Sequence, residues 1–165
     1  MDDRELFATW LRLRGDLDSV AARLAREVEA ATGLGMTGFQ VLGRLALEPG
    51  RTIPMSRLAR ELVFTTGGFT KLADRLVALG LLERRGALDD RRVVLAVLTE
   101  RGAALAAAGL GAYAAALRRF VLGPIGEEGI AQLAALADRL ALACPRGKAT
   151  FATPLEERAA GSGRR

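Results

Sequence analysis

The sequence contains no histidine and only one cysteine among its 165 residues. The lack of histidine excludes catalytic sites of the Ser-His-Asp and Cys-His kinds, and it removes a common ligand of zinc and iron. A single cysteine cannot form an internal disulfide, which agrees with a reducing compartment. No paired carboxylates stand out either. We therefore expect a protein that is not an enzyme and that needs no metal or other cofactor.

Long hydrophobic runs are also missing. No uninterrupted apolar stretch approaches the roughly 20 residues that a membrane-spanning helix needs. The N-terminal "MDDRELFATW" is acidic and lacks the basic start and apolar core of a secretion signal. Half of the residues are apolar and 26% are charged, which is typical of a folded globular protein. We expect a cytoplasmic protein without a membrane partner.

Positive charge is unevenly distributed along a chain whose net charge is +5. Residues 51–101 hold 10 basic and 6 acidic side chains, a net charge of +4. Residues 146–165 hold 5 and 2, a net charge of +3, whereas residues 1–50 hold 6 and 8, a net charge of −2. The basic middle of the chain indicates a polyanionic partner.

Apolar residues at alternating spacings of three and four predict helices along most of the chain. A first helix of about 25 residues should end at Gly33, and a second should begin with Thr37 as its N-cap. A short third helix is predicted at 55–62 and a fourth at about 66–79, ended by Gly80.

A hairpin and two more helices are predicted after these. "LLERR" and "RRVVLAVLT" flank "GALDD", a connection typical of a β-hairpin. Thr99 should cap a fifth helix that runs to about Leu122, where "GPIG" breaks it, and a sixth helix covers about 127–143. Residues 146–165, rich in Gly, Pro, Arg and Thr, predict a flexible basic tail. The predicted fold class is mainly α with a small β-wing.

The third and fourth helices predict a helix-turn-helix, whose second helix enters the major groove of DNA. Its inward face should hold Phe69, Leu72, Leu76 and Leu79. Its outer face should hold Thr66, Thr70, Lys71, Asp74 and Arg75. Because Gly67 and Gly68 have no side chain, a phosphate can approach the free amides at the helix start. The alternative is that "TTGG" is only a turn with a threonine cap.

The predicted hairpin is basic, with arginines expected around its tip at Arg84, Arg85, Arg91 and Arg92. Guanidinium groups on such a wing can enter the minor groove or contact phosphates. The alternative is a solvated hairpin in which Asp89 and Asp90 neutralise the arginines. The two elements together predict a winged helix-turn-helix more specifically than either does alone.

The first, fifth and sixth helices keep apolar stripes that the small core of the middle segment cannot cover. A two-fold dimer would cover them, and a monomeric bundle is the alternative. We predict one domain at 1–145, with a DNA-binding lobe at about 36–99 and dimerisation helices at about 3–32 and 100–143.

These motifs resemble the MarR-type transcriptional regulators. The matching text is "MTGFQVLGRL", "RLAREL", "TTGGFTKLADRLVALGLLERR" and "DDRRVVLAVLTERG", in that order. The resemblance covers about 36–102 by motif and nearly all of 5–143 by helix plan. It implies a homodimeric repressor that binds a palindromic operator and releases it when a small anionic or aromatic ligand binds. The alternative is a winged-helix module that binds protein, or nucleic acid without sequence preference.

The resemblance also implies residues that contact DNA. The predicted DNA-binding residues are Thr65, Thr66, Gly67, Gly68, Thr70, Lys71, Arg75, Asp90, Arg91 and Arg92. Asp90 and Arg92 match the wing's Asp-x-Arg, in which the aspartate orients an arginine that reaches DNA. This chain departs from the family pattern at Ala87-Leu88, where Asp-Pro is common, and at Pro54, where a Ser or Thr cap is usual.

An effector site is implied between the dimer helices and the winged lobe. Trp10, Arg14 and Gln40 have suitable character on the first two helices, although packing in the dimer stripe is the alternative for Trp10. "GGFTK" resembles the urate-responsive branch, which generally has an acidic residue in place of Gln40. Cys144 continues the stripe of the sixth helix, and we expect a buried structural thiol there and not a redox switch.

Overall fold

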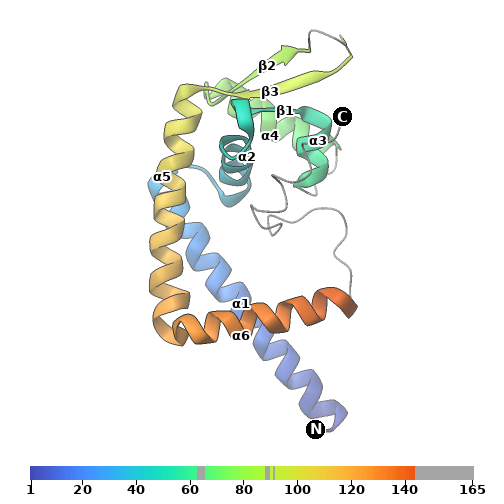
Figure 1. The fold of residues 1–165 in the computed structure, drawn as a ribbon, viewed down its shortest axis with the longest axis vertical. Coiled ribbons are helices and arrows are strands. Elements are labelled where there is room, and N and C mark those ends of the chain that lie inside the picture. Colours follow the sequence, from blue (N-terminus) through green and yellow to red (C-terminus); the bar gives the residue numbers. More distant parts are fainter. Residues whose placement is uncertain (63–65, 88–89, 91, 144–165) are drawn as a thin grey trace.

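The structure is a computed structural model that describes residues 1–62, 66–87, 90 and 92–143. Its elements are α1 (Asp3–Thr32), α2 (Met36–Ala46), the 3₁₀ turn η1 (Pro49–Arg51), β1 (Thr52–Pro54), α3 (Met55–Glu61), α4 (Thr66–Ala78), β2 (Leu82–Gly86), β3 (Val94–Leu98), α5 (Glu100–Leu117), the π-helical turn η2 (Arg118–Leu122) and α6 (Gly123–Ala143). Figure 1 shows α2, α3, α4 and the sheet as a lobe at one end, from which α1 and α5 extend. Predictions on Thr65, Arg91, Cys144 and the tail at 146–165 lie outside the described residues.

Local capping chemistry sets the ends of α1. The Asp2 carboxylate accepts the Glu5 N–H at 2.8 Å, and the Glu5 carboxylate accepts the Asp2 N–H at 3.0 Å. This reciprocal pair satisfies two of the free amides at the helix start. At the other end Gly33 adopts a left-handed conformation with φ of 67°, which confirms the predicted C-cap.

The start of α2 differs from the prediction. The N-cap of this helix is Gly35, no side chain caps it, and Thr37 lies inside the helix. The reason is found earlier in the chain, where the Thr32 hydroxyl accepts the Leu34 N–H at 3.1 Å. That bond turns the chain immediately after α1, so α2 begins before Thr37.

The lobe has a core of aliphatic side chains from α2, α3, α4 and the sheet. The most deeply buried are Val41, Leu42, Leu45, Ile53, Leu58 and Leu76. On α4 the predicted inward positions Phe69 and Leu76 are buried, but Leu79 is 38% exposed, so that part of the prediction is wrong. Leu79 lies at the C-terminal end of α4, where the lobe covers it only in part.

The sheet has three antiparallel strands in the order β1-β3-β2. The hairpin pairs Leu82 with Leu98 and Gly86 with Val94, as the flanking sequences predicted. The sequence analysis missed β1, which pairs Thr52 with Val97. Three residues are too few to show the period-two pattern of a strand, and proline in this strand fits its place at the sheet edge.

The start of α5 rests directly on the chain that leaves α4. The Thr99 hydroxyl accepts the Gly102 N–H at 2.9 Å, which confirms the predicted cap, and it also donates to the Gly80 carbonyl at 2.9 Å. The Thr99 N–H donates to the Leu81 carbonyl at 3.3 Å. A Cβ on Gly102 would lie 2.2 Å from that carbonyl oxygen, so only glycine allows this approach.

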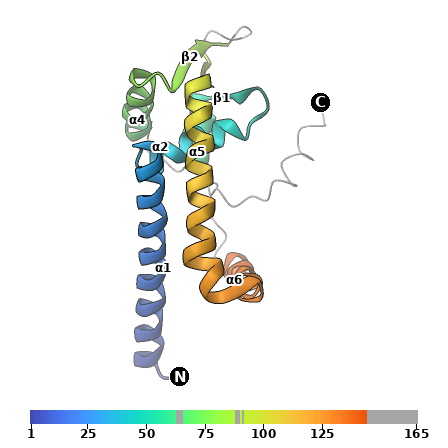
Figure 2. The same ribbon diagram turned by 90° about the vertical axis from the view of Figure 1, so that its left-hand side faces the viewer.

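The long helices pack beside one another below the lobe. Figure 2 shows α1 and α5 running side by side. A Cβ on Gly109 of α5 would lie 2.6 Å from the Phe39 ring of α2, so this glycine also permits close packing. The predicted break after α5 is confirmed: Gly126 has φ of 68° and ψ of 178°, and Figure 1 shows α6 turning sharply away from α5.

Large apolar side chains are exposed along α1 and α6. On α1 they are Leu6, Phe7, Trp10, Leu11, Leu13 and Leu17, and on α6 they are Ile125, Ile130, Leu133, Leu136, Leu140 and Leu142. The stretch Glu100–Ala143 is long and apolar enough to cross a membrane by length and composition alone, with 17% of its most apolar window buried. One such stretch is weak evidence for a membrane protein, and the turn at Gly126 interrupts this one. The predicted cytoplasmic location stays a prediction.

Candidate nucleic-acid interface

The two faces of α4 separate as predicted along its described side chains. Phe69 and Ala73 are buried against the lobe, and Thr70, Lys71 and Arg75 are exposed on the other side. Asp74 is exposed between the basic residues. The helix therefore presents polar and charged side chains outward from a fixed apolar base.

The start of α4 is rich in glycine, as predicted. Thr66 is the first helical residue, and Gly67 and Gly68 follow in the first turn. The first amides of a helix have no intrahelical acceptor and lie at the positive end of its dipole. The positive end of the dipole attracts a phosphate, and Gly68 presents no side chain in its way.

The tip of the wing is a tight turn in which Asp90 holds the backbone. The Asp90 carboxylate accepts the Arg92 backbone N–H at 2.9 Å, and the Val93 N–H donates to the Asp90 carbonyl at 2.9 Å. The guanidinium Nε of Arg92 lies 3.9 Å from the same carboxylate, and its side chain is 96% exposed. This arrangement is compatible with the orienting role predicted for Asp90.

Two of the four wing arginines are not at the tip, so that prediction is wrong for them. Arg84 and Arg85 lie in the body of β2, opposite Ala96 and Leu95 of β3. The strand directs Arg84 back toward α4, where its Nη1 lies 2.6 Å from Oδ1 of Asp74.

Arg85 is also paired locally, since its Nη2 lies 2.6 Å from Oε2 of Glu83. The pairing of Arg84 with Asp74 joins α4 to the wing. Sequence reasoning missed this link because nothing local to either residue indicates that β2 folds back across α4.

The elements that carry these side chains lie at one end of the molecule. Figure 2 shows α4 and the hairpin beyond the end of α1 that is farthest from the N-terminus. Lys71, Arg75 and Arg92 therefore belong to neighbouring elements at that end. This is the candidate nucleic-acid interface.

A ring of ion pairs ties α2 to α3, the first helix of the helix-turn-helix. Arg44 is 5% exposed. Its Nε lies 2.6 Å from Glu61 and its Nη1 lies 2.7 Å from Glu48. Arg57 bonds to the same two carboxylates at 2.8 Å and 3.1 Å, which closes the ring. The sequence analysis missed this ring: the i,i+4 spacing indicates the pairs Arg44–Glu48 and Arg57–Glu61, but nothing local indicates the links between the two pairs.

The ring also changes the acidity of Glu61. Burial by itself would raise the pKa of this carboxyl, but hydrogen bonds from Arg44 and Arg57 outweigh burial and lower it below its ordinary value. Glu61 therefore stays ionised to lower pH than an exposed glutamate.

The predicted effector residues do not meet within one chain. Trp10 and Arg14 are exposed on α1, and Gln40 is partly buried on α2. A helix rises 1.5 Å per residue, so Trp10 lies about 30 Å along α1 from its C-terminal end, which α2 follows. The three side chains could form one site only if a second copy supplied some of them.

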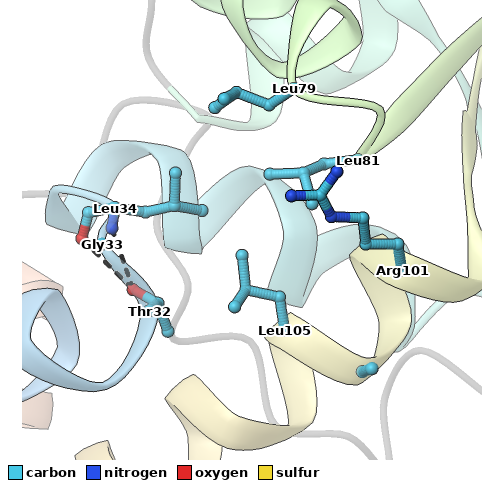
Figure 3. Close-up of a pocket in the computed structure, with 8 residues that line it drawn as sticks. Thr32, Gly33, Leu34, Leu79, Leu81, Arg101 and Leu105 are labelled. Carbon is cyan, nitrogen blue, oxygen red and sulfur yellow. Dashed lines mark hydrogen bonds between the residues drawn. The ribbon is translucent and has the colours of Figure 1, made fainter.

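A cavity that the sequence did not predict lies where α1, α4 and α5 meet. Its volume is about 410 Å³. Figure 3 shows its lining, which consists of Thr32, Gly33, Leu34, Leu79, Leu81, Arg101, Ala104 and Leu105. Over the described ranges, no cluster of three or more His, Cys, Asp or Glu side chains is arranged to hold a metal ion.

Comparison with known proteins gives a family match and several similar structures. Residues 32–93 match the model of the MarR family. Sco3205, a MarR family transcriptional regulator from Streptomyces coelicolor solved in complex with DNA, aligns with a TM-score of 0.78 and 20% identity over 92% of this chain and 94% of its own. A search of curated sequences finds no match.

Two further structures are similar. A probable transcriptional regulator from Pseudomonas aeruginosa is 29% identical, with a TM-score of 0.64 over 75% of this chain and 92% of its own. The organohalide-sensing regulator RdhR-CbdbA1625, solved with 2,4-dichlorophenol bound, is 19% identical, with a TM-score of 0.73 over 93% of this chain and 92% of its own. These likenesses confirm the predicted winged-helix fold.

Proposed function

We propose that this chain, whose residues 32–93 match the model of the MarR family, is a transcriptional regulator that binds double-stranded DNA in a sequence-specific manner. The observation that carries the proposal is the exposed basic face of α4 beside the exposed Arg92 of the wing. A helix of this kind fits the major groove, and an arginine on a wing fits the minor groove. Sco3205, which has the same fold, was solved in complex with DNA.

The proposed interface includes all the residues predicted from the sequence. They are Thr65, Thr66, Gly67, Gly68, Thr70, Lys71, Arg75, Asp90, Arg91 and Arg92. Lys71 and Arg75 would read bases or neighbouring phosphates, and the start of α4 would hold a phosphate. Asp90 would act indirectly, by fixing the backbone from which Arg92 reaches DNA.

We propose that the protein acts as a homodimer on a palindromic operator. The exposed apolar side chains of α1 and α6 support this, because a single chain leaves them in water. A two-fold axis through these helices would bury one stripe against its copy and present two α4 helices to successive half-sites. Repression is the proposed outcome, relieved by a small aromatic or anionic ligand, as the dichlorophenol bound to RdhR-CbdbA1625 suggests by analogy.

A footprint on the DNA upstream of the protein's own reading frame tests the proposal. We expect one protected, palindromic site and an affinity that falls steeply with salt. Lys71→Ala should weaken protection, and Arg26→Ala, on the exposed surface of α1, is the matched control that should not. Uniform coating of all DNA would instead indicate a non-specific nucleic-acid module. Absence of any DNA binding would indicate a protein-interaction module.

A further inference from the structure

Lysine is almost absent from this basic chain. Of its 24 basic side chains 22 are arginine, and the two lysines are Lys71 and Lys148. Lys148 lies outside the residues that the structure describes, whereas Lys71 is exposed on α4. A lysine amine becomes a nucleophile when it loses its proton, but arginine stays protonated in proteins. Lys71 is therefore the one basic side chain in the described part of the chain that can accept an acyl group.

The surroundings of Lys71 leave its amine open to solvent. A helical side chain lies over the turn that precedes it, and here that turn contains Gly67 and Gly68, which have no side chains. Asp74, three residues later, is the carboxylate that a helix would bring to Lys71. Its Oδ1 instead lies 2.6 Å from Nη1 of Arg84. Because Asp74 is held in this way, none of the described residues forms an ion pair with Lys71.

We propose that Lys71 is an acylation site, whose substrate is an acyl phosphate such as acetyl phosphate. The surface around it attracts a dianionic donor, since Arg75 is exposed one turn further along α4 and Arg92 is exposed on the neighbouring wing. The Lys71 amine releases a proton to water, and its Nζ attacks the carbonyl carbon of the donor. A C–N amide bond forms, the C–O bond to phosphate breaks, and phosphate leaves with the bonding electrons.

Acylation would remove a positive charge from the proposed nucleic-acid interface. The amide that forms is neutral and longer than the amine, so it no longer pairs with a phosphate as an ammonium does. In a dimer the change occurs twice per operator, and we expect operator affinity to fall by about tenfold or more. Operator bound to α4 would in turn cover Lys71 and protect it from the donor. This regulatory step rests on the proposed function, whereas acylation itself does not.

The first experiment uses the full chain without DNA and acetyl phosphate as the probe. Mass spectrometry of peptides, taken at intervals, measures the acetylated fraction at each lysine. We expect Lys71 to react at least as fast as Lys148, and the matched control Lys148→Arg to leave the rate at Lys71 unchanged. The site is wrong if Lys71 reacts more slowly than Lys148, or if it stays unmodified under conditions that acetylate a lysine in a free peptide.

Operator titrations before and after treatment with acetyl phosphate test the regulatory step. Treatment should weaken binding by wild type and by Lys148→Arg, and bound operator should slow the acetylation of Lys71. Lys71→Arg, whatever its own affinity, should lose none of it on treatment, because arginine accepts no acyl group. The regulatory step is wrong if wild type acetylated at Lys71 binds operator like the untreated chain, or if treatment weakens Lys71→Arg equally. A chain that is acetylated at Lys71 but binds no operator before treatment would overturn the proposed function and leave the site intact.

Discussion

At the scale of single residues, the charged side chains of α4 and the wing have different proposed roles in DNA binding. Lys71 is exposed one turn into α4, where its side chain would reach base edges in the proposed interface, whereas Arg92 is exposed at the wing tip. Arg84 would have a third role, because its pairing with Asp74 neutralises a negative charge on the proposed DNA-facing side. Lys71, Arg84 and Arg92 are all positively charged, but each therefore needs a different test of its contribution to DNA binding.

Substitution of Lys71 or Arg92 by alanine should weaken operator binding by tens-fold or more, since each contact occurs twice per dimer at roughly 1–3 kcal/mol. Arg92→Ala should weaken many sequences alike and make the salt dependence shallower. Lys71→Ala should relax preference at particular base pairs of each half-site. Titrations at several salt concentrations, on operator and mutated operator, measure both effects. Wild-type affinity in both variants would contradict the assignment of these residues.

Glycine at position 102 should be required for stability. A Cβ there would lie 2.2 Å from the Leu81 carbonyl oxygen, so Gly102→Ala must push α5 away from the lobe. We expect a loss of about 1–3 kcal/mol in the free energy of unfolding. Gly43→Ala is the matched control, because nothing lies within 4 Å of its Cβ position in α2 and alanine favours a helix by up to about 1 kcal/mol. Urea unfolding measures both, and equal stability of the two variants would refute the close contact.

At the scale of elements, the angle between α2 and α3 depends on the ring of Arg44, Glu48, Arg57 and Glu61. Each carboxylate accepts from both arginines, so no charge in the ring is left without a partner. Arg44 is the most buried of the four. Arg44→Met should therefore lower the free energy of unfolding by about 1–3 kcal/mol, because each carboxylate loses one of its two donors. Guanidinium is itself a charged denaturant, so urea melts are the appropriate measurement.

The ring should also make stability depend on pH in the acid range. The pKa of Glu61 is lower in the folded than in the unfolded state, so the unfolded state binds the proton more readily. The stability that Glu61 contributes is therefore present above its ordinary pKa and is lost as pH falls through the lowered folded pKa. In Glu61→Gln the acid loss of unfolding free energy between about pH 5 and 3 should be smaller than in wild type. Equal slopes would mean that Glu61 does not titrate with folding.

Most element boundaries with a local signal were predictable, although the Thr37 cap predicted for α2 was wrong. Gly33, Gly80 and Thr99 act on amides and carbonyls a few residues away, and each ends or begins a helix as predicted. The exposed face of α4 was predictable for the same reason, because helical spacing alone separates it from the core.

The rest depends on partners that are distant in the sequence. Arg44 meets Glu61 across 17 positions, and β1 exists only because β3 pairs with it. The cavity requires α1, the end of α4 and α5 to meet. No short stretch of sequence indicates these long-range contacts. The sequence analysis therefore missed the ring of ion pairs, strand β1 and the cavity.

At the scale of the whole molecule, the long helices leave an apolar surface that the lobe does not cover. Trp10 is 53% exposed, and Leu136, Leu140 and Leu142 of α6 are at least as exposed. This surface is the one that the predicted dimer would bury, so the same residues should control both association and operator affinity.

Charges placed on this surface should separate the subunits without unfolding them. Leu136 and Leu140 are exposed in the single chain, so the double substitution to glutamate costs little there but would place four charges in the interface. Analytical ultracentrifugation should show a monomer with weak operator binding. Deletion of residues 1–30 or 123–165 should likewise give a monomeric or aggregating product. A fragment 36–102 that binds operator as tightly as the full chain would contradict the dimer.

The backbone of Gly126 has a consequence for which operators the protein accepts. Its φ of 68° and ψ of 178° belong to a region that essentially only glycine occupies, and this residue sets the direction of α6. In a dimer joined through α6, that direction fixes the distance between the two recognition helices. Gly126→Ala would re-aim α6, and the preferred number of base pairs between half-sites should change. The preferred number of base pairs between half-sites would then depend on a residue that does not contact DNA.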